Sequence, residues 1–526
     1  MQIDDSVRTV LARLEAAGHQ AFLVGGCVRD ALRRVALNRG QMEPLRSNPT
    51  QAHDSVLPSD WDIATSATPE QVGELFAGVH SGGGGAAGAA DVAGAAGAIP
   101  PAASVDALDW QVVPTGLKHG TVTLLARHTA AAGNGGSGSD SGASPDCHDR
   151  DHRQAAKHRR DTRGKNRDCN AGAQKIEVTT FRRDGDYADG RHPTAVRFVG
   201  SIEEDLARRD FTINALAYSQ KTGLVDPFGG VADLAAGTLR AVGQPQARLR
   251  EDALRIMRAL RFAATLDLNI EQNLTAALHE ERDLLHKVSA ERIQSELMRM
   301  LPGPAIARVL LEFPDVLAVV VPEIAPTVGF DQRSRHHAYD VWEHSARAVE
   351  AAPPDATLRL ALLFHDLGKP QTFVLDAQGR GHFPGHAEAS AHIAATRLRQ
   401  LRFSRAVCTR VAKLVRYHSS PLGADSLSRL LKQLGAANLR QLLELRRADQ
   451  IAHRQENLDK CLAQVDAAAA MLERETLAIS GHDLIALGFT QGRELGECLE
   501  RLRAQVLAGT LANEREALLR AAGMRQ

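Results

Sequence analysis

The sequence predicts an α+β protein, in which a small mixed β-sheet near the N-terminus is followed by helices. Short apolar or alternating segments at 21–24, 59–63, 120–126 and 175–182 are typical of strands. Apolar residues at helical spacing come later, as in E-R-I-Q-S-E-L-M-R-M-L at 291–301. A chain of 526 residues is longer than one hydrophobic core usually holds, so we expect several domains.

The composition is that of an ordinary globular protein, with 44% hydrophobic and 24% charged residues. The formal net charge is zero, so any RNA-binding surface has to be a local basic patch. The six cysteines show no framework spacing, which favours a reducing compartment. The N-terminus lacks the pattern of a signal peptide and no apolar run has the length of a membrane span. We therefore expect a cytoplasmic protein.

Two aspartates, Asp60 and Asp62, stand two residues apart in the segment L-P-S-D-W-D-I-A-T-S-A-T at 57–68. On a strand, residues i and i+2 point to the same face, so both carboxylates would project side by side. Like charges this close repel unless a cation lies between them, and oxygen ligands suit Mg²⁺. Glu177, on an alternating strand, can supply a third carboxylate. We predict a catalytic Mg²⁺ site here, although an isolated Asp-x-Asp pair is also typical of a solvated turn.

Two glycines, Gly25 and Gly26, separate an apolar strand from a helix that carries Arg29. Glycines at such a junction let the backbone approach a phosphate, and a helix N-terminus favours anions. A Gly-Gly pair is also common in ordinary turns. Its position shortly upstream of the acidic pair favours a phosphate-binding role for these two glycines and Arg29.

Five segments in this order resemble the class II nucleotidyltransferases, which comprise the tRNA CCA-adding enzymes and the bacterial poly(A) polymerases. The segments are L-V-G-G-C-V-R-D (23–30), S-D-W-D-I-A-T-S-A-T-P-E (59–70), E-V-T-T-F-R-R-D-G-D-Y-A-D-G-R-H-P (177–193), E-D-L-A-R-R-D-F-T-I-N-A-L-A-Y (204–218) and E-D-A-L-R-I-M-R-A-L-R-F-A-A (251–264). The resemblance covers most of residues 20–80, 110–127 and 175–300.

This resemblance implies a polymerase-beta-like head, in which the acidic pair holds two Mg²⁺ ions that activate a 3′-hydroxyl and neutralise the triphosphate. It also implies that the glycine pair and Arg29 contact the triphosphate. Arg209 and Asp210, in R-R-D-F-T-I-N-A, would bind the nucleotide. The implied substrates are CTP and ATP, and the implied partner is tRNA, recognised at its acceptor arm and 3′ end.

The segment 251–264 is predicted to form one amphipathic helix. Its packing face consists of Ala253, Ile256, Leu260 and Ala263. The opposite face carries Glu251, Arg255 and Arg258, flanked by Asp252 and Arg261. An Asp and an Arg at i, i+3 can present an acceptor and donors to the Watson–Crick edge of a base. The resemblance implies that Asp252 and Arg255 act as a protein template for choosing CTP or ATP, with Arg258 and Arg261 also binding nucleotide. The alternative is a surface salt bridge, worth about 0.2–0.5 kcal/mol.

A second set of histidines and aspartates begins at residue 336. H-H-A-Y-D-V-W-E-H-S places His344 on a helix, and L-R-L-A-L-L-F-H-D-L-G-K-P ends a helix with His365 and Asp366. Imidazoles combined with a carboxylate suit a transition metal better than Mg²⁺. This set resembles the HD superfamily of metal-dependent phosphohydrolases, which implies a divalent ion such as Ni, Co or Mn.

The residues that match the HD motif are His344, His365 and Asp366, and Asp449 in R-R-A-D-Q is the expected final ligand. Two further histidines match less closely and three compete with them; these are His386 and His418, then His337, His382 and His392. The implied activity is hydrolysis of phosphoester or cyclic phosphodiester bonds. A degenerate HD fold that only binds tRNA is the alternative.

Four regions are therefore predicted. They are a nucleotidyltransferase head at 1–218 with flexible insertions at about 81–105 and 129–173, a helical nucleotide-selecting neck and RNA-binding region at 219–325, an HD domain at 326–455, and a C-terminal helical tail at 456–526. The predicted function is addition or repair of the 3′-terminal C-C-A of tRNA, with a phosphohydrolase activity in the HD domain. Alternatives are a poly(A) polymerase, a partial CC- or A-adding enzyme, and a tRNA-binding protein without activity. The presence of an HD domain in the same chain favours the CCA-adding enzyme, because poly(A) polymerase relatives generally carry a basic tail in its place.

Overall fold

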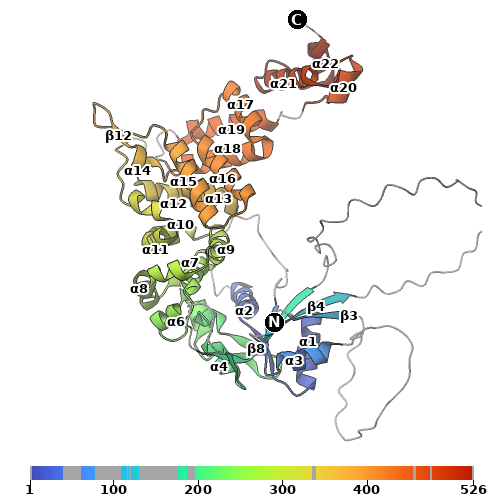
Figure 1. The fold of residues 1–526 in the computed structure, drawn as a ribbon, viewed down its shortest axis with the longest axis vertical. Helices are drawn as coiled ribbons and strands as arrows, with labels where there is room; N and C mark the ends of the chain where they lie inside the picture. Colours follow the sequence, from blue (N-terminus) through green and yellow to red (C-terminus); the bar gives the residue numbers. More distant parts are fainter. Residues whose placement is uncertain are drawn as a thin grey trace, which may run out of the picture.

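The fold is α+β, as the sequence predicts: a mixed sheet near the N-terminus is followed by a long series of helices (Figure 1). The computed structural model describes residues 3–38, 61–77, 108–114, 116–117, 120–128, 174–185, 196–333, 339–453, 458–473 and 477–523. Asp60 and the predicted insertions at 81–105 and 129–173 lie outside these residues. Within the described residues, no helix combines the length and apolar character needed to cross a membrane.

Seven strands form the sheet of the head in the order β3-β4-β5-β2-β1-β8-β9. Their bounds are β1 Ala21–Val24, β2 Trp61–Thr65, β3 Leu108–Val113, β4 Thr121–His128, β5 Gln174–Thr180, β8 Ala217–Ser219 and β9 Gly223–Val225. Only β2 and β5 among these neighbours run parallel, so the sheet is mixed, as predicted. Because β9 pairs with β8, the sheet continues past the expected head boundary at 218.

Two helices, α1 (Asp5–Ala16) and α3 (Pro69–Phe76), pack their apolar sides into the main core of the head, around the buried side chains of Trp61 and Ile63. The start of α3 follows from its sequence: the side chain of Thr68 accepts a hydrogen bond from the Gln71 amide, and the Gln71 side chain accepts one from the Thr68 amide. The remaining elements of this part are α2 (Gly26–Asn38), β6 (Arg182–Asp184), β7 (Val196–Phe198), α4 (Ile202–Ala207) and the 3₁₀ turn η4 (Thr212–Asn214).

The prediction of a single helix over 251–264 is wrong in one respect, because the helix is interrupted at Asp252 and Ala253. Helix α6 ends at Glu251, α7 runs over Leu254–Leu266, and Asp252 has an extended backbone. The Asp252 carboxylate accepts a hydrogen bond from the Leu254 amide at 3.1 Å. An aspartate that bonds a following amide favours a helix start over a helix interior, which explains the break.

Helices make up almost all of the body that follows. Their bounds, with two short strand pairs, are α5 Gly230–Ala235, β10 Thr238–Leu239, α6 Pro245–Glu251, β11 Asn269–Ile270, α8 Gln272–Glu280, η5 Arg282–Lys287, α9 Ala290–Met300, α10 Ile306–Glu312, α11 Pro314–Val320, η6 Pro322–Thr327, α12 Val341–Ala351, α13 Ala356–Phe364, α14 Lys369–Thr372, β12 Val374–Leu375, β13 Gly381–His382, α15 His386–Gln400, α16 Arg405–Tyr417, α17 Ala424–Leu434, α18 Ala436–Ile451, α19 Leu458–Glu473, α20 Gly481–Ala486, α21 Arg493–Leu507 and α22 Arg515–Gly523.

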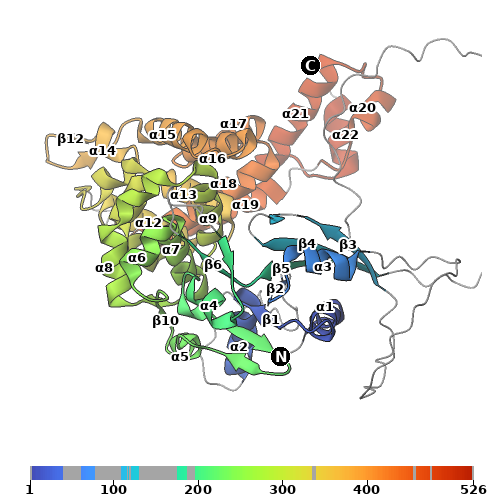
Figure 2. The same ribbon diagram turned by 60° about the horizontal axis from the view of Figure 1, so that its bottom comes forward.

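One hydrophobic core extends through this body, from Phe211 to Leu472. The predicted neck and HD regions therefore share a core, because α10 packs on α12 across the expected boundary at 325. Helices α20, α21 and α22 have a small core of their own at the C-terminal end, where α21 contacts α17 (Figures 1 and 2).

A buried arginine, Arg359 on α13, ties together the ends of two helices. Its guanidinium Nη1 donates to the carbonyls of Leu301 and Gly303, at 2.8 and 2.9 Å, just after α9. Its Nη2 donates to the carbonyl of Ala352 at 2.9 Å, just after α12. Burial lowers the pKa of Arg359 to about 10, so the group stays charged at neutral pH, where it also suits the negative ends of both helix dipoles.

Replacing Arg359 with methionine leaves these buried carbonyls without their donor. We expect Arg359→Met to lower the free energy of unfolding by about 3 kcal/mol, measured by urea unfolding followed by circular dichroism. The matched control is Arg347→Met, since Arg347 pairs with Glu343 on the surface and should contribute less than about 1 kcal/mol. Equal losses in the two variants would contradict this role.

Candidate functional site

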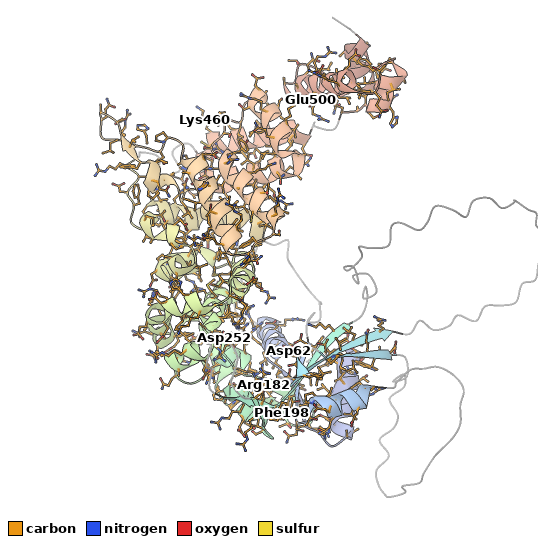
Figure 3. All side chains as sticks on the ribbon, in the orientation of Figure 1. Asp62, Arg182, Phe198, Asp252, Lys460 and Glu500 are labelled. Atoms are coloured by element: carbon orange, nitrogen blue, oxygen red, sulfur yellow. The ribbon has the colours of Figure 1, made fainter. Side chains whose placement is uncertain are left out.

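A cleft of about 450 Å³ lies between the head and α7. Its lining residues are Gly25, Gly26, Arg29, Asp62, Arg208, Arg209, Asp210, Asn214, Asp252, Arg255, Arg258, Arg261 and Phe262. Every nucleotide-binding residue predicted from the sequence is in this lining, together with Asp62. Figure 3 shows Asp62 on the head and Asp252 on the helical side.

The glycine pair at the start of α2 is in contact with the R-R-D-F-T-I-N segment. Gly25 has a left-handed backbone, with φ of +72°, and a Cβ at this position would lie 2.9 Å from Arg209 Nη1. Arg29 Nη1 donates to the Asn214 side-chain oxygen at 2.7 Å. A side chain at Gly25 would therefore displace Arg209, and only glycine readily adopts this backbone conformation.

The Asp62 side chain is exposed on β2, next to the parallel strand β5. Its register partner on β5 is Glu177, so the two side chains lie on the same face of the sheet. Glu177 is half-exposed and pairs with Lys175 Nζ at 2.5 Å. The structure thus puts a second carboxylate beside Asp62, while the catalytic role of both stays a prediction.

Asp210 is buried at the base of the cleft and accepts hydrogen bonds from several groups. Its carboxylate accepts from Arg258 Nε at 2.7 Å, from Asn214 Nδ2 at 3.1 Å and from the Phe211 amide at 2.8 Å. Burial acts to raise the pKa of Asp210, but Arg258 and Asn214 outweigh it and hold the pKa well below its usual value. Asn214, four residues after Asp210 in the same motif, was not predicted as a site residue.

The two predicted template residues are held by partners within the protein. Arg292 Nη1 and Nη2 donate to the two Asp252 carboxylate oxygens at 3.2 and 2.8 Å. Arg255 Nη1 donates to Glu251 at 2.6 Å, and its Nη2 to the Arg208 carbonyl at 2.8 Å. Arg255 is buried rather than on an exposed face as predicted, because its long side chain reaches back to the preceding helix and the head segment.

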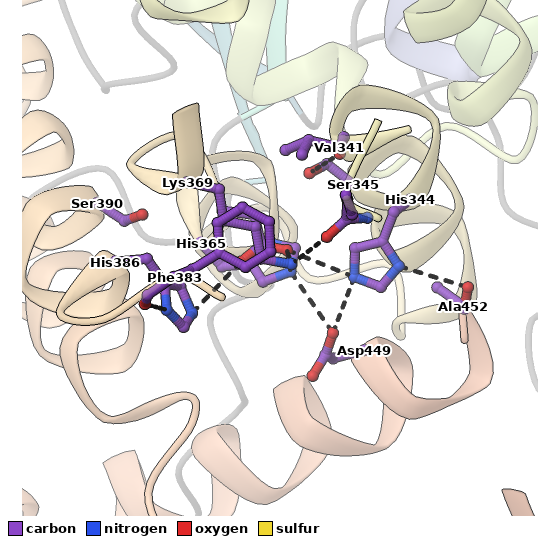
Figure 4. Close-up of polar contacts among 12 residues, drawn as sticks. Val341, His344, Ser345, His365, Lys369, Phe383, His386, Ser390, Asp449 and Ala452 are labelled. Carbon is purple, nitrogen blue, oxygen red and sulfur yellow. Dashed lines mark hydrogen bonds and ion pairs between the residues drawn. The ribbon is translucent and has the colours of Figure 1, made fainter. Parts of the chain in front are cut away.

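A second cluster is buried in the helical body (Figure 4). His344 from α12, His365 and Asp366 from the end of α13, and Asp449 from α18 meet here. His344 Nε2 lies 3.0 Å from Asp449 Oδ1, and His365 Nε2 lies 3.2 Å from Asp366 Oδ2. The other Asp366 oxygen faces His386 Nε2 at 3.7 Å and His418 Nε2 at 3.8 Å. All six predicted ligands therefore converge, and Asp366 faces histidines with both of its oxygens.

Each imidazole of this cluster is oriented by the backbone. The Nδ1 atoms of His365, His418 and His386 lie 2.6, 2.6 and 2.9 Å from the carbonyl oxygens of residues three positions earlier. A carbonyl only accepts, so Nδ1 carries a proton in each ring and Nε2 faces the carboxylates. This arrangement is typical of metal-ligating histidines, whose other ring nitrogen is fixed by an outer hydrogen bond.

Two buried carboxylates of this cluster lie beside imidazoles and Lys369. Burial acts to raise the pKa of Asp366, but His365 and Lys369 outweigh it and hold the pKa well below its usual value. Lys369 Nζ lies 2.7 Å from Asp366 Oδ2. The buried Nε2 atom of His365 lies 3.2 Å from Asp366 Oδ2 and 3.5 Å from Asp449 Oδ1. Two buried carboxylates and converging Nε2 atoms fit a divalent transition metal.

Two residues of this cluster were not predicted, and two competing histidines are not in it. Lys369 belongs to the quoted H-D-L-G-K motif, and His453 follows Asp449 by one helical turn, its Nδ1 at 3.7 Å from Asp449 Oδ1. His382 instead contacts Asp376 at 3.0 Å on the β12–β13 hairpin, and His392 is exposed on α15. The remaining competitor, His337, lies outside the described residues.

Family models match three parts of the chain. A model described as "Poly A polymerase head domain" matches residues 143–240. One described as "Probable RNA and SrmB- binding site of polymerase A" matches residues 267–327. One described as "tRNA nucleotidyltransferase domain 2 putative" matches residues 386–522.

Among solved structures, the Bacillus stearothermophilus CCA-adding enzyme in complex with CTP has the same fold, with a TM-score of 0.55 and 23% identity over 99% of this chain and 97% of that one. The Thermotoga maritima CCA-adding enzyme complexed with tRNA-CCA gives a TM-score of 0.53 at 16% identity, over 99% and 95% of the two chains. Both similarities concern the fold alone.

Curated relatives extend the similarity to the sequence. The CCA-adding enzyme of Limosilactobacillus fermentum is 28% identical over 99% of this chain and 96% of its own length. That of Enterococcus faecalis is 30% identical over 514 residues, which cover 97% of this chain and 93% of the relative. With identity at this level through nearly the whole of both proteins, the chain belongs to the family of CCA-adding enzymes, within the class II nucleotidyltransferases.

Proposed function

We propose that this protein adds or repairs the 3′-terminal C-C-A of tRNA, using CTP and ATP, by nucleotidyl transfer in the cleft between the head and α7. The observation that carries the proposal is the convergence of the predicted nucleotide-binding residues on one cleft, with Asp62 at its side. A glycine turn, several arginines and an exposed carboxylate are the groups that a metal-bound triphosphate requires.

The metal of this reaction would be Mg²⁺, held by Asp62 together with Asp60 and Glu177. The exposed Asp62 carboxylate and its neighbour Glu177 fit such an ion, because both are oxygen ligands on one face of the sheet. Bound Mg²⁺ would neutralise charge on the triphosphate and favour attack by the tRNA 3′-hydroxyl. The protein supplies the rest of the electrostatic stabilisation through its own side chains.

The triphosphate would lie against Gly25, Gly26 and the guanidinium groups of Arg29 and Arg209. Arg29 and Arg209 are both anchored on Asn214, by its side-chain and backbone oxygens at 2.7 and 3.4 Å. Arginines that are already ordered in the folded protein contribute to the reaction rate. Their conformational entropy is lost on folding and not during the reaction. Asp210 serves as their support, since its charge holds Asn214 and Arg258.

Asp252 and Arg255 would select the base. In the structure both are engaged with Arg292 and Glu251, so presenting their polar atoms to a nucleobase requires these contacts to be exchanged. Their exchange for base contacts would favour CTP or ATP according to the donor and acceptor pattern of each base. A poly(A) polymerase and a partial CC- or A-adding enzyme share the other features of this cleft.

A direct test uses labelled CTP and ATP, Mg²⁺ and tRNA that ends at its discriminator base, at -C or at -CC. The proposal predicts addition of the missing nucleotides up to C-C-A and then a halt. Untemplated A tails on any RNA would indicate a poly(A) polymerase instead. Addition that stops at C-C, or that begins only at C-C, would indicate a partial enzyme.

In the same assay, we expect Asp62→Asn to lower addition by at least about 1000-fold, because the isosteric amide cannot ligate the metal with a charge. The control is Asp5→Asn, whose carboxylate is exposed in the first turn of α1 and should leave the rate unchanged. An Asp62→Asn protein with most of its activity would show that the metal lies elsewhere.

Replacing Asp252 with alanine removes the predicted acceptor of the template. We expect Asp252→Ala to reduce the preference for the correct nucleotide by about 10- to 100-fold, while KM for the triphosphate changes less. Ratios of kcat/KM for CTP and ATP on tRNA ending at the discriminator base and at -CC provide the measurement. Unchanged ratios would refute the template assignment.

We further propose that residues 326–455 contain an HD-type phosphohydrolase site, with His344, His365, Asp366 and Asp449 as ligands of a divalent transition metal. His386 and His418 would ligate through Nε2 on the other side of Asp366, where His386 is the more exposed. The convergence of these six residues, far apart in the sequence, supports the proposal. A bound metal would supply Lewis-acid activation of a phosphoester, whereas a degenerate site would bind tRNA only.

Removing the carboxylate of Asp366 should prevent metal binding at this site. We expect Asp366→Asn to lose most of the Co²⁺ or Ni²⁺ that the full chain retains after reconstitution and dialysis, measured by elemental analysis, and to lose phosphatase activity on a generic phosphoester. The control is Asp376→Asn on the exposed β12–β13 hairpin, where the carboxylate contacts His382 and Arg380. Equal metal content in the two variants would contradict the site.

A further inference from the structure

One aromatic ring in the cleft lies among three guanidinium groups. Phe262 on α7 is 6% exposed and lines the cleft. Its ring centroid is 4.0 Å from the Cζ atom of Arg261 and 5.3 Å from those of Arg29 and Arg258. The ring also packs edge-on against Phe211, with centroids 5.7 Å apart.

A ring in this position attracts cations without neutralising them. A guanidinium within about 6 Å of an aromatic centroid is attracted by the negative charge on the ring face. This attraction uses none of the five N–H donors of the guanidinium. A carboxylate, by contrast, occupies N–H donors of the guanidinium group and neutralises its charge. Asp210 and Glu296 each hold one of the arginines in that way, Arg258 and Arg261 respectively.

The ring also bridges two parts of the molecule. Arg29 belongs to α2 of the head, whereas Arg258 and Arg261 belong to α7. Arg29 is fixed at two nitrogens, Nε by Asp30 and Nη1 by Asn214. Its third nitrogen, Nη2, lies 3.6 Å from the position that a Cβ atom on Gly26 would occupy. Contact with Phe262 thus keeps Arg29 beside the glycine pair and close to the arginines of α7.

We propose that Phe262 is a positioning residue for the triphosphate, whose ring gathers Arg29, Arg258 and Arg261 on one side of the cleft without adding a negative charge or occupying further N–H donors. The inference rests on the proposed nucleotide-binding role of the cleft. It assigns Phe262 no contact with the base, so its effect concerns the triphosphate of CTP and ATP alike.

The test changes the charge on the ring but not its shape. Phenylalanine at 262 in the full chain is replaced by 4-fluoro-, 3,5-difluoro- and 3,4,5-trifluorophenylalanine, and the Kd values of CTP, inorganic tripolyphosphate and cytidine are measured by calorimetry with Mg²⁺. We expect the Kd values of CTP and tripolyphosphate to rise stepwise, by about tenfold across the series, because each fluorine weakens the attraction for cations. The Kd of cytidine should not follow the series.

Conventional variants extend the test to turnover. Phe262→Leu should raise KM for CTP and for ATP by similar factors and change kcat less, and Phe262→Tyr should restore most of the loss. The same fluorinated series at Phe313, which stacks on His279 in the shared core, serves as the control and should leave nucleotide affinity unchanged.

A flat series at Phe262 in a protein that binds CTP would overturn the role of the ring, as would a Phe262→Leu effect that Tyr does not rescue. If the wild-type protein binds neither CTP nor tripolyphosphate, or if Arg258→Gln leaves their affinities unchanged, the proposed function of the cleft fails instead. Stepwise weakening at Phe262 together with loss on Arg258→Gln supports both.

Discussion

The cleft depends on a single buried carboxylate, that of Asp210. One of its oxygens accepts from Arg258 on α7, and the other accepts from Asn214, whose own side-chain oxygen holds Arg29 on α2. The head and the helical body are therefore joined by hydrogen bonds that pass through one ionised group. The low pKa of Asp210 matters here, because a protonated carboxyl would lose its attraction for Arg258 and weaken the whole chain of contacts.

Much of this organisation could be predicted from the sequence, where the pattern is local. The strand before the glycine pair depends on residues a few positions apart, and it forms as expected. The strands β3 and β9 were not predicted, because β3 borders segments without a clear period and β9 has only three residues. The break at Asp252 was missed for a different reason: apolar spacing continues through it, while the side chain competes for the amide of Leu254.

The same distinction, between features set by the local sequence and features set by distant contacts, applies to the site residues. The sequence motifs identified which side chains come together, but not the hydrogen-bond or ion-pair partner of each one. Nothing in the spacing indicated that Asp252 would be paired with Arg292, forty positions later, rather than with Arg255. Asn214 and Lys369 lay inside quoted motifs and were overlooked because neither is an obvious catalytic or ligating group. Phe262 lay inside a quoted motif without an assigned role, because one of its three arginine neighbours, Arg29, comes from another part of the chain.

The two clusters satisfy their charges by different means. In the cleft, Asp210 is matched by guanidinium groups, and both kinds of group remain charged at neutral pH. In the HD-like cluster, the facing groups are imidazoles, of which His418 has its pKa lowered to about 3, first by burial and then by the neighbouring His365. The His418 imidazole is therefore neutral at neutral pH, with its Nε2 free of a proton and able to ligate a metal.

The continuous core from Phe211 to Leu472 has a thermodynamic consequence. Helix α7, which lines the cleft, and helices α12, α13 and α18, which carry the buried histidine and aspartate cluster, belong to one packed unit and should unfold together. A ligand that binds only the folded unit stabilises all of it, by an amount set by its concentration relative to its Kd. Occupancy of either site then protects the helices of the other against unfolding and proteolysis, without any change of shape passing between them.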